Sequence, residues 1–244
     1  MKALMLILIV LISSSFAFAT DISGNISGVW DPAANPYNVT GDLRVPSGDT
    51  LFIEPGCFIN FMGHYKFNID SLALLRAIGT EQDSIIFTAE NADSGWFGLR
   101  FNYSDTNCLL SYCLIKHGQA ADHLQEPDNH GGGVYCYGAR LTITHCNISQ
   151  NRAWEGCGGG IYGNASRLII TNNIIANNFC GKGGAGIRLE NSEAFIDSNF
   201  IEHDTTYYLL GGEWGGGLSF IHSIATLSNS IIRNNLVVLS AGGY

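Results

Sequence analysis

Short runs of alternating apolar and polar residues fill the second half of the chain. Within these runs Ile, Val, Leu and Thr recur at alternate positions, and Gly, Asn or Ser separates one run from the next. Alternation with a period of two is typical of β-strands with one buried face, whereas helical spacing of apolar residues is absent. The pattern therefore predicts an all-β chain in which tight bends join short strands.

The strand pattern repeats at a nearly constant spacing. Four copies begin with a glycine cluster, and their first glycines are Gly131, Gly158, Gly184 and Gly215. Successive copies therefore begin 27, 26 and 31 residues apart. Apolar residues follow at the third, twelfth and seventeenth positions of each copy, and the twentieth position carries Asn151, Asn178, Asp204 and Asn235. A repeat of this length without a helix predicts a parallel β-helix, a solenoid with three short strands in each coil of about 27 residues.

Amides and other small side chains recur at the bends of the predicted coils. The fifteenth position, with a looser match one coil earlier, carries Cys113, Cys146, Asn173, Asn199 and Ser230. Stacked amides can donate and accept hydrogen bonds along the axis of a cross-β structure. We therefore interpret these asparagines as a structural ladder and not as catalytic residues.

The sequence divides into three segments. Residues 1–19 carry a short apolar run and end in the small-residue pattern AFA, which is typical of a secretory signal peptide. The run is too short for a membrane span, so we expect export to an extracellular or cell-surface location. Residues 20–94 are predicted to form an N-terminal cap and the first coils, and residues 95–244 the regular coils. A further glycine cluster begins at Gly242, so we expect the solenoid to be incomplete at its C-terminal end.

Charge narrows the range of partners. Without the predicted signal peptide, which contains Lys2, the chain has 11 basic and 21 acidic residues, and 11 − 21 gives a net charge of −10 with neutral histidines. This balance argues against a nucleic acid or an anionic lipid as the partner. The oligomeric state does not follow from the sequence.

Seven cysteines follow the predicted signal peptide, in a compartment where disulfides can form. Cys113 and Cys146 are expected at the same position of neighbouring coils, close enough for a bridge. Buried free thiols, packed as small apolar residues, are the alternative.

Two groups of motifs carry a resemblance to known proteins. PYNVTGDLRVPSGDTLFIEPGCFINF and LLRAIGTEQDSIIFTA, followed by GWFGLRF and CLLSYCLIKHG, resemble the N-terminal pattern of large secreted bacterial right-handed parallel β-helix proteins. The GGGVY and GGGIY units, with ISQN and IANN, are similar to the repeats of chlamydial polymorphic outer membrane proteins. The resemblance covers nearly all of the mature chain. It implies a right-handed β-helix, export and association with an outer membrane, in a group that includes adhesins, other surface proteins and polysaccharide-active enzymes.

Candidate binding residues lie where the copies differ in length. Only the stretch between the twentieth position and the next glycine cluster varies, namely residues 152–157, 179–183, 205–214 and 236–241. Solenoids usually place binding loops on such an edge. Aromatic and acidic residues gather there and suit a sugar ligand: Trp154, Glu155, Tyr207, Tyr208, Glu213 and Trp214. The corresponding earlier loop carries three acids that are candidate calcium ligands, Asp122, Glu126 and Asp128.

Other interpretations of these residues stay open. In one alternative, the aromatic residues only pack the loops onto the coils, and the acids are solvated. A polysaccharide lyase, epimerase or glycosidase would need convergent carboxylates or a base, and Arg188 with Glu190 is the one local acid and base pair to test. Ile174, Phe200 and Ile231 would form an outward apolar stripe, and so a partner surface, if alternation holds through the bend. We favour a non-catalytic scaffold that contacts a polysaccharide or surface glycan over an enzyme or a structural spacer. Calcium is the one cofactor that we consider for it.

Overall fold

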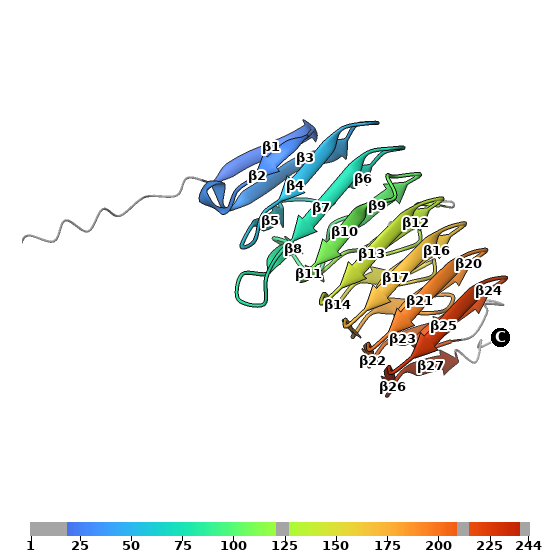
Figure 1. Ribbon diagram of the computed structural model, residues 1–244. Helices are drawn as coiled ribbons and strands as arrows, with labels where there is room; N and C mark the ends of the chain where they lie inside the picture. Colours follow the sequence, from blue (N-terminus) through green and yellow to red (C-terminus); the bar gives the residue numbers. More distant parts are fainter. Residues whose placement is uncertain (1–18, 121–126, 209–214, 240–244) are drawn as a thin grey trace, which may run out of the picture.

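The computed structural model describes residues 19–120, 127–208 and 215–239, and every structural statement below concerns these residues. They form a stack of coils in which β-strands wind around one axis (Figure 1). The single helical element is the short 3-10 turn Pro32–Ala34 near the N-terminal end. All but the last residue of the predicted signal peptide lies outside the described residues.

Each regular coil presents four faces in chain order, which we call faces I to IV. Face I contains β6 Phe67–Ile69, β9 Leu99–Asn102, β12 Val134–Tyr137, β16 Ile161–Asn164, β20 Ile187–Glu190 and β24 Leu218–Ile221. Face II contains β2 Gly28–Trp30, β4 Thr50–Ile53, β7 Leu74–Ile78, β10 Cys108–Ser111, β13 Arg140–Thr144, β17 Arg167–Thr171, β21 Glu193–Asp197 and β25 Ile224–Ser228. Face III contains β5 Phe58–Phe61, β8 Ile85–Ala89, β11 Cys113–Lys116, β14 Asn147–Ser149, β18 Ile174–Ala176, β22 Phe200–Glu202 and β26 Ile231–Arg233. Face IV contains β15 Arg152–Ala153, β19 Phe179–Cys180, β23 Thr205–Tyr208 and β27 Leu236–Leu239.

All of these strands pair in parallel with the equivalent strand of the next coil. The long strand β3 Tyr37–Val45 pairs with both β5 and β6 and so joins faces I and III into one sheet of 15 strands, while β1 Thr20–Asn25 pairs with β3 at its edge. Face II is a separate sheet of 8 strands and face IV one of 4. The prediction of an all-β parallel solenoid is confirmed.

The predicted register of the repeats is also confirmed. Val134 pairs with Ile161, Ile143 with Ile170, and Ile148 with Ile175, as the third, twelfth and seventeenth positions require. Equivalent apolar side chains therefore stack on one another inside the rod, where those of the complete inner coils are fully buried. Burial of these side chains provides most of the driving force for winding each coil onto the last.

Amide ladders fill the corners of the core. At the bend between faces II and III the backbone of Asn172 is left-handed, with φ of +56°, which turns the next side chain, that of Asn173, inward. Asn173 Oδ1 accepts from the Cys146 N–H at 2.8 Å, and Asn173 Nδ2 donates to the Ile143 carbonyl at 2.9 Å and to Asn199 Oδ1 at 3.0 Å. The predicted structural role of these asparagines is confirmed.

The cysteines belong to the core. All seven are buried free thiols, so Cys113 and Cys146 stack without a bridge, with the Cys113 N–H 3.4 Å from Cys146 Sγ. Burial raises the pKa of the Cys57 thiol to about 11, which keeps it protonated at neutral pH.

Predicted and observed strands differ in the N-terminal segment and on face IV. Alternation in residues 37–45, 50–53, 57–61, 72–77 and 85–88 predicts strands, which correspond to β3, β4, β5, β7 and β8. The strands β1, β2 and β6 were not predicted; in β6 only Phe67 and Ile69 point inward. The variable stretches, expected to be loops, instead begin with the short strands of face IV. Among the described residues, no helix is both long and apolar enough to cross a membrane.

Candidate functional site

A groove runs along face IV, on the edge where the repeats differ in length. Its floor is a row of outward side chains in register, because Arg152 of β15 pairs with Phe179 of β19, and Phe179 pairs with Thr205 of β23. The residues that follow them, Ala153 and Cys180, are fully buried and fix the row to the core. Strand alternation therefore places an arginine, a phenylalanine and a threonine one after another along the axis, each on a different coil.

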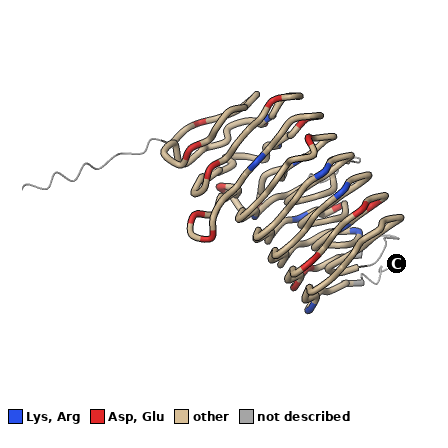
Figure 2. Tube along the Cα trace, in the orientation of Figure 1, with Lys and Arg blue, Asp and Glu red and all other residues tan. Residues whose placement is uncertain are grey.

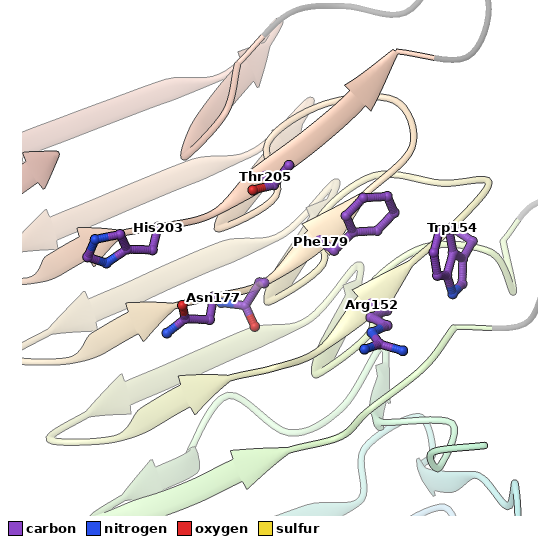
Figure 3. A pocket seen from close by; sticks show the side chains of 7 residues that line it. Arg152, Trp154, Asn177, Phe179, His203 and Thr205 are labelled. Atoms are coloured by element: carbon purple, nitrogen blue, oxygen red, sulfur yellow. The ribbon is translucent and has the colours of Figure 1, made fainter. Parts of the chain in front are cut away.

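The bend before face IV supplies the opposite border of the groove. Asn177 and His203 have left-handed backbones, both with φ of +57°, and their side chains are exposed. The resulting pocket has a volume of about 460 Å³, and Figure 3 shows the side chains that line it, which come from three successive coils. The lining residues are Arg152, Trp154, Asn177, Asn178, Phe179, His203 and Thr205.

Two aromatic rings meet at one end of the groove. Trp154 is 40% exposed, and its ring centroid lies 4.5 Å from that of Phe179 at an interplanar angle of 54°. Gly181 occupies the next coil at the position equivalent to Trp154, and a Cβ there would lie 1.9 Å from the Trp154 carbonyl oxygen. The following coil therefore places no side chain beside Trp154 at the Gly181 position, and the indole stays partly exposed.

The charge of the lining is positive. Among the described residues no Asp or Glu lines the pocket, while the Arg152 guanidinium carbon lies 6.0 Å from the Trp154 ring centroid. Within the described part of the chain, Arg152 makes no ion pair with a carboxylate. Figure 2 shows acidic residues on the first coils and again towards the C-terminal end, while basic residues recur along the coils between them. The groove thus offers a positively charged side chain to a ligand, although the net charge of the protein is strongly negative.

The structure places the predicted sugar-binding residues as follows. Trp154 lines the groove, and Tyr207 is a half-buried residue on β23 of the same face that does not line it. Glu155 follows Trp154, and its carbonyl accepts from Asn129 Nδ2 at 3.3 Å. Tyr208 ends β23. The remaining two predicted residues, Glu213 and Trp214, lie outside the described residues.

Sequence reasoning missed five lining residues, Arg152, Asn177, Phe179, His203 and Thr205. A signal for them was present in the repeat, because Arg152 and Phe179 directly follow the buried amides Asn151 and Asn178, and His203 directly precedes Asp204. Residues on either side of a buried ladder residue must point outward at the same corner.

The predicted calcium ligands are only partly described. Asp122 and Glu126 lie outside the described residues. The carboxylate of Asp128 is 2.8 Å from Lys66 Nζ and 3.7 Å from Arg100 Nη2, so basic side chains surround it. Across the described ranges, no cluster of three or more His, Cys, Asp or Glu side chains is arranged to hold a metal ion.

The acid and base pair on β20 is enclosed. Arg188 is buried and 2.9 Å from Glu190 Oε1, and it donates to Ser219 Oγ at 2.6 Å. Glu190 Oε2 accepts from the Tyr162 hydroxyl at 3.0 Å. Arg188 belongs to a row of side chains that point outward from face I but are buried under other segments. The row is in register and consists of Arg100, Tyr135, Tyr162 and Arg188. This network fastens covering segments onto the sheet, and it leaves Arg188 no open surface for a substrate.

The apolar stripe on face III points outward, as alternation predicts. Ile174, Phe200 and Ile231 are each more than two fifths exposed and lie in register.

Comparison with known sequences identifies the architecture: the family profile described as "Right handed beta helix region" matches residues 79–243. No match was found among curated proteins or among solved structures.

Proposed function

The chain belongs to the right-handed β-helix family, and from this premise we propose that it is a non-catalytic scaffold whose groove on face IV binds a glycan. Because residues 1–19 have the pattern of a signal peptide, we propose that it acts outside the cell or at the cell surface. The family includes both enzymes and adhesins, so the activity has to be argued from the site itself.

The observation that supports this proposal is the pairing of Trp154 with Phe179 inside an open groove. Flat, partly exposed rings provide apolar area for a pyranose face at little entropic cost. Asn177, His203 and Thr205 place hydrogen-bonding groups along the same groove, within reach of sugar hydroxyls. Because the groove crosses three coils, it suits an extended oligosaccharide more than a single sugar.

The absence of acids from the described lining argues for binding without turnover. Glycoside hydrolysis commonly uses a pair of carboxyl groups on either side of the bond to be cleaved. None of the described residues that line this pocket is Asp or Glu. Arg188 and Glu190, the one pair with suitable chemistry, are engaged with each other and with Tyr162 on face I.

The proposal is tested with a glycan array, run with and without calcium, and a parallel assay for unsaturated or reducing-sugar products. We expect binding without product formation. Calcium-dependent binding would assign the acidic residues Asp122, Glu126 and Asp128 a role in the ligand site. Product formation would show that the protein is an enzyme. No signal in either assay would contradict glycan binding and leave a structural spacer or a protein-binding surface as the function.

Arg152 is the one Lys or Arg among the described lining residues of the groove, and it predicts an anionic glycan. Arg152→Gln should weaken binding of a uronate-containing or sulfated oligosaccharide by about 10-fold or more, because a charge-assisted hydrogen bond is worth about 1.5–3 kcal/mol. The loss should shrink as salt rises. Titrations at two ionic strengths measure it, with Arg167→Gln, which changes an arginine paired with Glu193 on face II, as the matched control. Equal losses in the two variants would exclude a specific role for Arg152.

A further inference from the structure

One rung of the amide ladder beneath the groove contains an acid. Three of the four residues at this corner are asparagines whose Nδ2 donates to a carbonyl of the preceding coil, at 2.9–3.0 Å. The donor and acceptor pairs are Asn151 with Ile115, Asn178 with Ile148, and Asn235 with Ile201. The remaining rung is occupied by Asp204, which has no amide nitrogen to donate.

The two oxygens of Asp204 have different surroundings. Oδ1 accepts from the Asn178 N–H at 2.8 Å and from Asn178 Nδ2 at 3.0 Å, and thus reproduces the amide oxygen of the ladder. Oδ2 has no hydrogen-bond partner, although Asp204 is completely buried. In the spacing of the repeat, the carbonyl equivalent to those of Ile115, Ile148 and Ile201 is that of Ile175. A carboxylate oxygen would repel this carbonyl, whereas a protonated Oδ2 can donate to it.

Among the described residues, no cation pairs with Asp204 to stabilise its ionised form. Its hydrogen-bond partners are neutral: Asn178 donates to Oδ1, and the Asp204 N–H donates to Asn235 Oδ1. Nearby charged groups lie at the surface: Glu202 is paired with Arg233, and His203 is exposed. Burial, opposed in part by hydrogen bonds from Asn178, raises the pKa of Asp204 to about 8.

Asp204 is joined directly to the groove. Its neighbours in sequence, His203 and Thr205, line the pocket, as does Asn178, which donates to Oδ1. We propose that Asp204 is a proton switch beneath the groove, which completes the ladder when protonated and loosens the central coil of the groove when ionised. The groove is therefore formed best in mildly acidic surroundings. Only the consequence for ligand binding rests on the proposed function; the switch itself is a property of the fold.

Global stability gives the first test. The native pKa of Asp204 lies above its value of 3.8 in the unfolded chain, so the native state holds an extra proton between these pH values. The contribution of protonated Asp204 is complete below about pH 4 and is lost as pH rises to about 8. Over that range, the unfolding constant of the wild-type protein should rise by up to about 10-fold per pH unit relative to Asp204→Asn. Urea unfolding at pH 5, 6, 7 and 8 measures this ratio, and parallel profiles for the two proteins would overturn the proposal.

A matched variant separates the switch from ordinary surface titration. Asp197 is half-buried at the surface of face II, and hydrogen bonds from Ser228, Ser198 and Asn229 lower its pKa. Asp197→Asn should therefore keep the wild-type fall in stability between pH 5 and 8. His203→Gln should keep it as well, because the imidazole of His203 points to solvent. Loss of the fall in either variant would assign the effect to the surface instead of to Asp204.

Hydrogen exchange locates the change at the groove without any ligand. After correction for intrinsic rates, protection of the Asn178 and Thr205 amides should fall by about 10-fold or more from pH 5 to pH 8 in the wild-type protein and stay constant in Asp204→Asn. Equal protection in both proteins at all pH values would contradict the switch. Because no glycan is needed, failure of the glycan proposal on the array would leave this result intact.

Discussion

Replacing Gly159 with alanine is expected to destabilise the protein by at least about 3 kcal/mol. A Cβ at this position would lie 2.3 Å from the Phe179 carbonyl oxygen and 2.8 Å from the Phe179 nitrogen. These are backbone atoms of the next coil, so no side-chain rotation can relieve the clash. Overpacking of this kind usually costs about 1–3 kcal/mol even where side chains can adjust. Coils would have to separate locally, and β19 would shift away from its place in face IV.

Equilibrium unfolding in urea measures the effect, and a glycine elsewhere provides the control. Gly48→Ala adds the same methyl group where no atom lies within 4 Å, although the left-handed backbone at Gly48, with φ of +78°, costs about 1–2 kcal/mol. A change at Gly159 no larger than that at Gly48 would contradict the close packing of the coils. A larger one would show that the glycine clusters of the repeat are required by the distance between coils.

Replacing Asn173 with alanine should lower stability by about 2–3 kcal/mol. The amide of Asn173 is buried and serves the Cys146 N–H, the Ile143 carbonyl and Asn199 Oδ1. Its removal leaves buried backbone groups without this partner, and each unsatisfied group costs about 1–3 kcal/mol. Water cannot easily take its place, because the corner lies inside a closed coil.

The residue before it gives the control for this prediction. Asn172 is exposed at the same bend, and glycine readily adopts its left-handed backbone, so Asn172→Gly should change stability by less than about 0.5 kcal/mol. Thermal and urea unfolding of the two variants compare a buried with an exposed asparagine in one bend. Similar losses would mean that the ladder contributes little to stability.

Much of the fold could be predicted because the repeat specifies it more than once. The alternation that buries Ile143, the glycines that permit close coils and the amides that fill the corners all recur at fixed positions. The short strands of face IV were not predicted, since two-residue strands such as Arg152–Ala153 show no periodicity. Their formation depends on pairing with the same positions of neighbouring coils.

The site was less predictable than the fold. Trp154 could be predicted because it is an aromatic residue in a stretch of variable length. Arg152 and Phe179 could not, because they form one surface only after the coils are stacked. On face I, Tyr135 and Tyr162 point outward from their strands and are nevertheless buried. Chain segments around His130 and Cys157 cover these rings. The alternation within a strand cannot predict this covering, because the covering segments lie outside the strand.

The most direct test of the glycan proposal is the affinity of the best array glycan for three proteins: wild type, Trp154→Ala and Phe195→Ala. Phe195 is 45% exposed and Trp154 40%, but Phe195 lies on face II, away from the groove. Calorimetric titration should show at least about a 10-fold loss for Trp154→Ala, because burial of an aromatic ring is worth about 1.5–3 kcal/mol. Phe195→Ala should bind like the wild-type protein. Unchanged binding by Trp154→Ala would contradict the assignment of face IV as the glycan-binding surface.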